Sequence, residues 1–342
     1  MQYLPLGNTG LYVSRICFGT MTFNEPDRLF GAVVGAMGQE TADRMVGAAL
    51  DAGVNFFDTA NVYGDGVSER MLGKALGDRR GDAVIATKVH STQSEEINAL
   101  GTSRLSIMRE LEGSLRRLGT DWIDLYQVHS FDPTTPLEET LRALDDCVRQ
   151  GKVRYIGLSN FAGWQIAKAD GLARRMGTER FCSVQAYYSL VGRELEREIL
   201  PAAMDLGLGT MIYSPLAGGF LSGKYTGGDA GEGRRKKFAF PPVDVERGDR
   251  IVEALREIGP AHDASPAQLA LAWLLHKPGV TSVIVGATKM AQLQDNIAAV
   301  DLELSSEEME RLDGLSALSP EYPAWTPTVP RGVNPFAALG QL

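Results

Sequence analysis

The chain has 342 residues, of which 44% are hydrophobic and 23% charged, so it is long enough and apolar enough to bury a large core. Its formal net charge of −9 at pH 7 argues against nucleic acid as a partner, because binding to phosphates requires a basic surface. No apolar run approaches the roughly 18 residues of a membrane-spanning helix, so we expect no membrane partner.

Short runs of β-branched and aromatic residues alternate along the chain with longer segments of helical period. A pair of short strands is expected at 3–6 and 13–17, forming an N-terminal hairpin over 1–15. Eight further strands are predicted at 16–20, 55–59, 83–89, 123–129, 153–159, 182–188, 209–214 and 281–285.

Three of the segments between these strands carry clear helical signals. TADRMVGAALDAG (41–53) is amphipathic, and TPLEETLRALDDCVRQG (135–151) starts with Thr-Pro and acidic residues and ends at a glycine. In TSRLSIMRELEGSLRRLG (102–119), Gly119 stands where a C-cap glycine would. The apolar side chains that recur there at helical spacing are Leu105, Met108, Leu111, Leu115 and Leu118.

Strand–helix alternation repeated about eight times predicts parallel strands joined by crossovers. Eight such units fit an α/β fold of the closed (β/α)₈ TIM-barrel type, for which about 250 residues is typical. No segment has the composition of an interdomain linker, so we expect one domain over 1–342. The surplus residues are assigned to the hairpin, to extended loops at one end of the barrel, including a long loop over 218–262, and to a C-terminal tail over 318–342.

Polar side chains stand at the ends of three consecutive predicted strands. Asp58 ends the second strand and Tyr63 follows in the next loop, Lys88 is near the end of the third, and His129 ends the fourth. Each alone could serve a structural purpose, as a helix cap, an ion-pair partner or a core histidine. Because the chemistry of such barrels lies at the C-terminal ends of the strands, four groups at one rim favour a catalytic site.

The set Tyr63, Lys88 and Asp58 suits proton transfer. A free tyrosine is a poor acid, with a pKa of about 10. A nearby ammonium lowers the pKa of a phenol, and a carboxylate holds that ammonium charged and in place. His129 could hydrogen-bond a carbonyl oxygen and orient it toward Tyr63. Such a site protonates an oxygen but has no redox centre, so it would need a hydride-carrying cofactor.

The sequence contains no G-x-G-x-x-G that follows a strand, which is the usual signal of a dinucleotide site. In barrels, a phosphate site is commonly built from the loops after strands seven and eight. Here these loops read YSPLAGGFLSGKY (213–225), which supplies Lys224, and VGATKMAQLQDN (285–296), which leads into a predicted helix N-terminus. The alternative is a pair of glycine-rich connections without a ligand.

Six motifs in order, FFDTANVYG, ATKV, YQVH, GLSN, SPLAGGFLSGKY and GATKMAQLQDN, resemble those of the aldo-keto reductases. The resemblance extends from Tyr3 to Leu315 and is strongest to the bacterial and potassium-channel-β-like branch. It implies a catalytic tetrad of Asp58, Tyr63, Lys88 and His129, with Tyr63 as the general acid. It also implies NADP(H) bound across the barrel mouth without a Rossmann fold.

The same resemblance implies a set of cofactor contacts. Those near the nicotinamide are Gly19, Thr20, Met21, Asp58, Ser159, Asn160, Gln185 and Tyr213. Those along the pyrophosphate are Ser214, Pro215, Leu216, Ala217, Gly218 and Lys224, with Arg234 as a further partner. Those at the adenosine end are Gly286, Thr288, Lys289, Gln292, Asp295 and Asn296.

Two departures from the family pattern bear on function. Many members carry an arginine at the position of Gln292 that reads the 2′-phosphate, so Lys289 or Arg234 would have to supply the cation here. We therefore expect NADP(H), with NAD(H) as the alternative. Some channel β subunits lack the histidine at position 129, which this chain keeps. That favours an enzyme.

The expected reaction interconverts an aldehyde or ketone and an alcohol by hydride transfer. Two alternatives stay open: a regulatory subunit that senses the cofactor with little turnover, and a Schiff-base lyase that uses Lys88. The N-terminus lacks a secretory signal, and the three cysteines, Cys17, Cys147 and Cys182, have no metal-ligand spacing, so we expect a cytoplasmic protein without a metal. The small carbonyl or alcohol substrate, the role of the tail and the formation of a homo-oligomer are not specified by the sequence.

Overall fold

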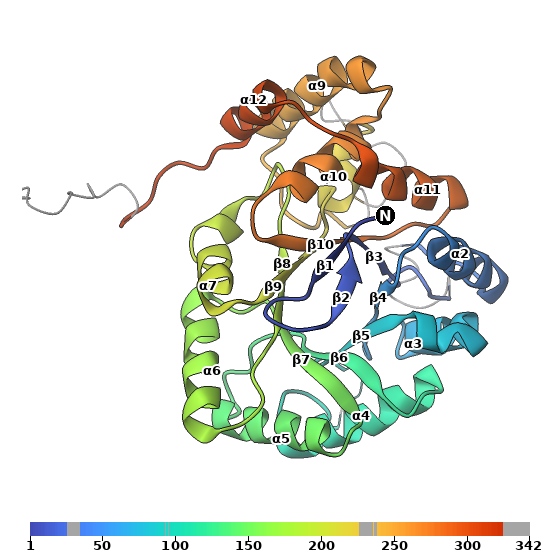
Figure 1. Ribbon diagram of the computed structural model, residues 1–342, viewed down its shortest axis with the longest axis vertical. Helices are drawn as coiled ribbons and strands as arrows, with labels where there is room; N and C mark the ends of the chain where they lie inside the picture. Colours follow the sequence, from blue (N-terminus) through green and yellow to red (C-terminus); the bar gives the residue numbers. More distant parts are fainter. Residues whose placement is uncertain (26–34, 93, 95, 226–234, 236–237, 324–342) are drawn as a thin grey trace, which may run out of the picture.

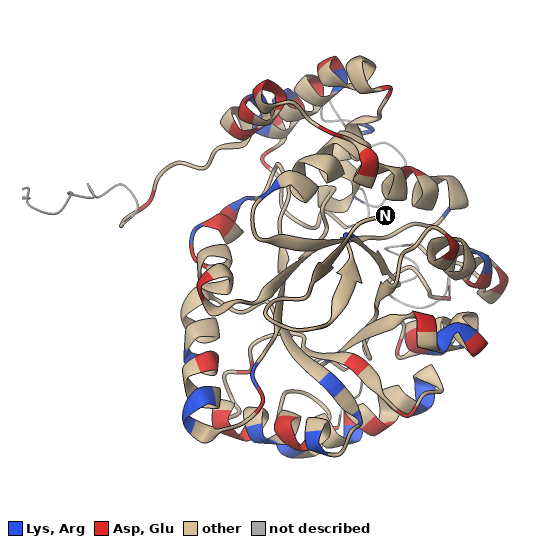
Figure 2. Ribbon diagram, viewed as in Figure 1, with Lys and Arg blue, Asp and Glu red and all other residues tan. Residues whose placement is uncertain are grey.

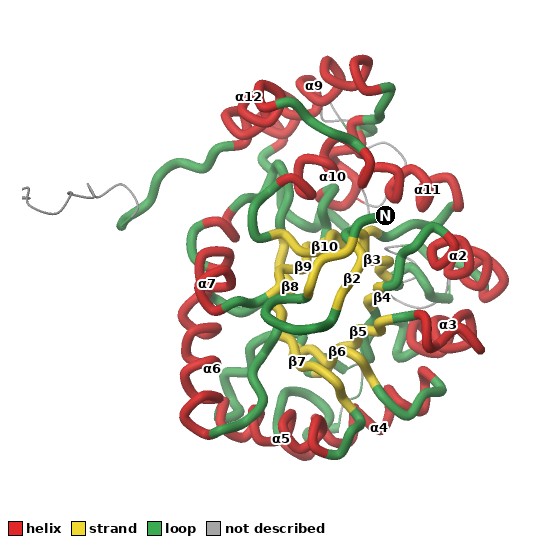
Figure 3. Tube along the Cα trace, in the orientation of Figure 1, coloured by secondary structure: helices red, strands yellow, loops and turns green. Residues whose placement is uncertain are grey.

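The computed structural model describes residues 1–25, 35–92, 94, 96–225, 235 and 238–323. Its centre is a closed barrel of eight parallel strands in the order β10-β3-β4-β5-β6-β7-β8-β9, which confirms the predicted TIM barrel (Figure 3). The strands are β3 (Ile16–Gly19), β4 (Phe56–Asp58), β5 (Val84–Val89), β6 (Ile123–Val128), β7 (Val153–Ser159), β8 (Ser183–Tyr187), β9 (Gly209–Tyr213) and β10 (Val280–Val285). Each of the eight strands expected from the sequence is present, and β10 pairs with β3 to close the ring.

Helices surround the barrel (Figure 1). They are α2 (Gln39–Asp51), α3 (Val67–Leu76), α4 (Arg104–Leu118), α5 (Leu137–Arg149), α6 (Gly163–Met176), α7 (Ile199–Leu206), α9 (Val245–His262), α10 (Pro266–His276), α11 (Met290–Ala298) and α12 (Ser306–Ser316). Short 3₁₀ helices lie at Gly77–Asp82, Glu194–Glu196, Ala217–Ser222 and Ala299–Asp301. Charged residues gather on the helices, while the barrel strands are nearly free of them (Figure 2).

Helix α4 shows how local sequence sets the bounds of a helix. The Ser103 side chain accepts a hydrogen bond from the backbone N–H of Ser106, and Gly119 ends the helix with a φ of 64°. The buried face is formed by Ile107, Leu111, Leu115 and Leu118. The spacing predicted Leu105 on the apolar face, but this residue is 60% exposed. The buried apolar face of the helix begins at Ile107.

The prediction of a long loop over 218–262 is wrong for its second half, because residues 245–262 form helix α9. The Asp244 side chain caps this helix by accepting from the N–H of Arg247 at 3.1 Å. The helix then buries Ile251, Leu255 and Ile258 against α10 and α12. That apolar spacing of four and three residues was the signal that the sequence interpretation missed.

The N-terminal hairpin, formed by β1 (Tyr3–Pro5) and β2 (Tyr12–Ser14), closes one end of the barrel. In Figure 1 it lies across the barrel end that faces the viewer. Its Gly7 has a φ of 61° and sits so close to the backbone at the starts of β8 and β9 that a Cβ there would lie 2.5 Å from a carbonyl oxygen of Cys182. The hairpin thus occupies the N-terminal ends of the strands, and the opposite end is left for a site.

Candidate active site

Asp58 and Lys88 form a buried ion pair at the C-terminal end of the barrel. The Lys88 ammonium lies 2.5 Å from Asp58 Oδ1, and the two side chains are 0% and 4% exposed. Lys88 also donates to the carbonyl oxygen of Thr59 at 2.8 Å. Burial lowers the pKa of Lys88, but the charge of Asp58 and the contact with Tyr63 outweigh it and raise that pKa above its ordinary value. Lys88 is therefore a charged ammonium.

The second oxygen of the Asp58 carboxylate is held by two glutamine side chains. Gln185 Nε2 donates to Oδ2 at 2.8 Å and Gln127 Nε2 donates to the same atom at 3.1 Å. Gln127, from β6, was missed by the sequence interpretation although it lies two residues before His129 in YQVH. The alternation of a strand, which sends residues 127 and 129 to the same face, was the available signal.

Tyr63 brings its phenol to Lys88 from the loop between β4 and α3. The Lys88 ammonium donates to the Tyr63 hydroxyl at 3.4 Å and lies 5.0 Å from the centre of the phenol ring. The His129 ring meets the Tyr63 ring edge to face, with centroids 5.9 Å apart. The structure therefore brings all four predicted catalytic groups together.

His129 is held as a neutral imidazole. Burial first, and then the positive charges of Lys88 and His90, lower its pKa to about 3. Its Nδ1 is buried and has no hydrogen-bond partner among the described residues. Buried polar atoms without a partner are rare in folded proteins, so this nitrogen sets His129 apart from an ordinary core histidine.

His90, two residues after Lys88, was not singled out from the sequence. Its φ of 137° is rare for a residue with a side chain, and its Nδ1 lies 3.2 Å from Ser91 Oγ. Strained backbone of this kind concentrates at functional sites. The sequence carries no signal for it, because the conformation comes from the loop that follows β5.

The residues predicted near the nicotinamide lie in or directly after five strands, β3, β4, β7, β8 and β9. Thr20 follows β3, and its Oγ1 lies 2.7 Å from Ser68 Oγ and 3.1 Å from the Asp58 carbonyl oxygen. Gly19 ends β3, where a Cβ would lie 2.7 Å from the side chain of Ile284. Met21 is the next residue after Thr20, at the same end of the barrel.

Asn160 joins three strand ends. Its Nδ2 donates to the His129 carbonyl oxygen at 2.9 Å and to Ser159 Oγ at 3.1 Å, and its Oδ1 accepts from the Tyr213 hydroxyl at 3.0 Å. Its φ is 56°, a left-handed conformation. Ser159 and Tyr213 end β7 and β9, and Gln185 lies in the middle of β8 opposite Ser159, so these residues predicted near the nicotinamide form one cluster.

The loop after β9 has an unusual run of left-handed backbone. Ser214 and Ala217 both have a φ of 49°, and Gly218 has a φ of 67°. Pro215 and Leu216 lie between them in a turn that the Ala217 N–H closes onto the Ser214 carbonyl at 2.8 Å. Such turns expose backbone N–H groups and can cradle an anion.

Two basic residues were expected beside this loop. Lys224 is exposed, and its ammonium lies 5.0 Å from the ring centre of Tyr225 and close to Gly219. Arg234, the second of them, lies outside the described residues. Its neighbour Arg235 donates to the carbonyl oxygens of Ala217 and Pro241, each at 2.9 Å, and so fastens the loop from outside.

The expected adenosine contacts surround the start of α11. Gln292 Oε1 accepts from the Thr288 N–H at 3.0 Å and from the Lys289 N–H at 3.2 Å, which caps the helix. Asn296 reaches back to the Gly286 carbonyl oxygen at 3.5 Å, and Ser265 donates to Asp295 at 3.3 Å. Lys289 is exposed at the N-cap, where both its charge and the helix end favour an anion.

Among the described residues, no cluster of His, Cys, Asp and Glu is arranged to hold a metal ion. In the same part of the chain, no helix is long and apolar enough to cross a membrane.

The sequence pattern of the aldo/keto reductase family matches residues 15–317. The chain belongs to this family. The match covers the whole barrel and its helices, including the three strand ends and the loop that supply the buried ion pair, the phenol and the imidazole. Aldo/keto reductases are oxidoreductases, and that is the class of activity the family supports.

Curated relatives of full length include both enzymes and channel subunits. An oxidoreductase of Bacillus subtilis, YrpG, is 40% identical over 95% of this chain and 100% of its own length. A protein of Oryza sativa named probable voltage-gated potassium channel subunit beta is 36% identical over 94% and 98%. The versiconal hemiacetal acetate reductase of Aspergillus parasiticus is 31% identical over 98% and 99%. This aldo/keto reductase therefore has relatives of the potassium-channel-β type, as expected.

Proposed function

We propose that this protein is an NADP(H)-dependent carbonyl reductase, or an alcohol dehydrogenase in the reverse direction, with Tyr63 as the proton donor and acceptor. The observation that carries the proposal is the contact of the Tyr63 hydroxyl with the Lys88 ammonium, 3.4 Å apart, in a chain of this family. The substrate class is a small aldehyde or ketone and the corresponding alcohol.

Lys88 makes the Tyr63 proton available. The ammonium beside the phenol favours the phenolate form, so the proton leaves the hydroxyl more readily than in water. Asp58 keeps Lys88 charged, since the two are 2.5 Å apart and almost fully buried. The two glutamines on Asp58 Oδ2 fix the carboxylate, so the ammonium has one position relative to the phenol.

His129 would orient the substrate oxygen. A neutral imidazole offers one donor and one acceptor. With a pKa of about 3, His129 is neutral near pH 7. It therefore contributes a hydrogen bond and no charge. Its ring stands edge to face against Tyr63, which allows both groups to reach the same carbonyl oxygen.

The residues present fit a nicotinamide cofactor, which when bound supplies the hydride. Gly19, Thr20, Met21, Ser159, Asn160, Gln185 and Tyr213 would hold the nicotinamide end, and Tyr213 is partly buried beside Asn160. The turn 214–218 and Lys224 would bind the phosphates. Lys289 at the start of α11 would bind a 2′-phosphate, which is why NADP(H) is favoured over NAD(H).

Two other readings are weaker. The relative named as a channel subunit is compatible with a cofactor-sensing role for this chain. The intact set of four groups, however, favours turnover. A Schiff-base lyase needs a neutral amine at Lys88, and the ion pair with Asp58 raises the pKa of that amine. All three cysteines are buried and free, which suits a reducing compartment, and we propose the cytoplasm.

The test is a titration of NADPH and NADH by protein fluorescence quenching, together with turnover of a panel of small aldehydes and ketones. The proposal predicts tighter binding of NADPH than of NADH, and oxidation of NADPH by members of the panel. Binding without turnover of any carbonyl or alcohol would favour the sensing role. If neither nucleotide bound, the proposal would be wrong.

A further inference from the structure

Tyr63 differs from the other three groups of the site in how it is held. Asp58 and Lys88 lie within strands, and His129 directly follows one, whereas Tyr63 stands in the middle of the loop 59–66. The next three residues, Gly64, Asp65 and Gly66, have φ values of 56°, 55° and 78°. No strand therefore fixes the position of this phenol. Its position depends on the contacts that hold the loop 59–66 in place.

Glu69, in the first turn of α3, ties the end of this loop to the barrel. It is 0% exposed, and its Oε1 accepts from Thr87 Oγ1 at 2.6 Å. Its Oε2 accepts from Arg117 Nε at 2.5 Å. Thr87 directly precedes Lys88 in β5, so one carboxylate joins the Tyr63 loop, the Lys88 strand and helix α4.

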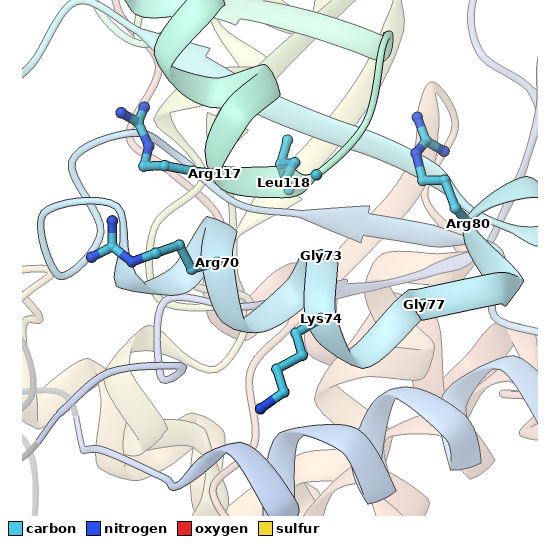
Figure 4. A pocket seen from close by; sticks show the side chains of 8 residues that line it. Arg70, Gly73, Lys74, Gly77, Arg80, Arg117 and Leu118 are labelled. Carbon is cyan, nitrogen blue, oxygen red and sulfur yellow. The ribbon is translucent and has the colours of Figure 1, made fainter.

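Arg117 lies directly on the loop itself. A Cβ added at Gly66 would lie 2.3 Å from Arg117 Cδ, so the arginine side chain fills the space that a side chain at 66 would need. Figure 4 shows Arg117 extending from α4 above the first turns of α3, along a groove of about 320 Å³. The Lys74 side chain points away from Arg117. The basic residues that line the groove therefore do not converge on one ligand position.

Glu110 holds the beginning of the loop in the same way. It lies two turns before Arg117 on α4, and its Oε2 is 3.8 Å from Arg117 Nη2. The same oxygen accepts from Asn61 Nδ2 at 2.9 Å. Asn61 is 6% exposed and its N–H donates to the carbonyl oxygen of Lys88 at 3.4 Å. Both ends of the Tyr63 loop are thus fastened to one face of α4.

We propose that Asn61, Glu69, Glu110 and Arg117 form a bracket that sets the position of the Tyr63 phenol relative to Lys88 and His129. These four are positioning residues, since each acts through the loop and not on the reacting atoms. The inference rests on the proposed role of Tyr63. On the inner side Ser68 anchors the same turn by donating to the Thr20 carbonyl oxygen at 2.7 Å, so the bracket supplies the outer constraint.

The chain offers a matched pair of arginines for the test. Arg116 and Arg117 are neighbours on α4, but Arg116 is exposed to solvent whereas Arg117 lies against the loop. Arg117→Met removes the arginine of the bracket. Arg116→Met removes the same charge from a position outside the bracket. Because Arg117→Met leaves the buried Glu69 unpaired and could fail to fold, Glu110→Leu and the double variant Glu69→Gln/Arg117→Met are made as well.

The measurements are kcat with a saturating carbonyl, the Kd of NADPH, and the pH at which activity falls on the alkaline side. A displacement of about 1 Å can lower turnover by about 10²-fold, so we expect kcat to fall by roughly 10- to 100-fold in the bracket variants. The alkaline midpoint should move to higher pH, because Lys88 stabilises the phenolate less from a greater distance. The Kd of NADPH should stay within about twofold of wild type, and Arg116→Met should resemble wild type in all three measurements.

Wild type and Tyr63→Phe are measured in parallel, so that failure of the bracket and failure of the proposed function can be told apart. If wild type turns over no carbonyl, or if Tyr63→Phe keeps full activity, the proposed function is wrong. If those two behave as proposed while the folded bracket variants keep the wild-type kcat, only the bracket is wrong. A lower kcat with an unmoved alkaline midpoint would also overturn it, since general loosening of the structure would then account for the loss.

Discussion

At the scale of single residues, the site depends on burying charged and polar groups in complementary pairs. The Lys88 ammonium has Asp58, the Thr59 carbonyl oxygen and the Tyr63 hydroxyl within 3.4 Å, and the Asp58 carboxylate has Lys88 and two glutamine amides. His129 is the exception, because its Nδ1 is buried without a partner among the described residues. The ion pair therefore has its hydrogen-bonding groups satisfied, whereas His129 keeps one buried nitrogen that is not.

The pKa of His129 yields a prediction about stability against pH. Its pKa of about 3 in the folded state is below the ordinary value of about 6.5 in the unfolded chain. Between these values the unfolded chain binds a proton that the folded protein does not. This contribution to stability is therefore complete above pH 6.5 and is lost as the pH falls toward 3.

For wild type, the free energy of unfolding should drop between pH 6.5 and pH 5 by about 2 kcal/mol more than for His129→Asn, at about 1.4 kcal/mol per pH unit. Urea unfolding of both proteins at the two pH values measures this difference. Equal pH dependence in wild type and variant would show that His129 titrates normally in the folded protein.

At the scale of elements, strands and their ends were the part of the structure most readily predicted. Each barrel strand is a short apolar run, and Asp58, Lys88 and His129 stand at strand ends, so their convergence follows from the topology alone. The sequence does not reveal how Gln127 and Gln185 turn toward Asp58, because contacts across the barrel depend on register. Helix α9 was missed because its Asp244 cap follows a segment that reads as a loop.

Helix α11 provides a prediction at this scale. Its N-terminus is capped by Gln292 and carries Lys289, whose cation we propose as the partner of a 2′-phosphate. Lys289→Met should weaken binding of NADPH by roughly tenfold, the lower end for a charge-assisted hydrogen bond at an exposed position, and leave NADH unchanged.

Fluorescence titration of both nucleotides at low salt measures this effect. Lys168→Met, which removes an exposed lysine from α6, is the matched control and should bind both like wild type. Equal weakening of NADPH and NADH by Lys289→Met would contradict the assignment of the 2′-phosphate to Lys289.

At the scale of the whole molecule, the barrel has two ends with different tasks. The hairpin and the side chains of Leu6, Val13 and Phe56 fill the N-terminal end with an apolar core. The C-terminal end holds the ion pair, the phenol, the imidazole and the strained turns after β7 and β9. Because the hairpin closes the N-terminal end of the barrel, only the C-terminal end is left for a site. The loops that follow the separate strands meet at that end.

The sequence predicted this division because hydrophobic alternation and motif order extend over the whole chain. It could not predict the bracket behind Tyr63. Glu69, Glu110 and Arg117 are ordinary charged residues in amphipathic helices, and only the packing of α3 against α4 buries them together. Such networks depend on the relative placement of helices, which local patterns do not specify.

The most direct test of the account is the rate at which wild type and Tyr63→Phe oxidise NADPH with an aldehyde or ketone that wild type reduces. Loss of the general acid should lower kcat by about 10²- to 10⁴-fold, while the Kd of NADPH and the thermal unfolding midpoint stay close to wild type. A Tyr63→Phe protein that reduces the same carbonyl at the wild-type rate would contradict the central claim.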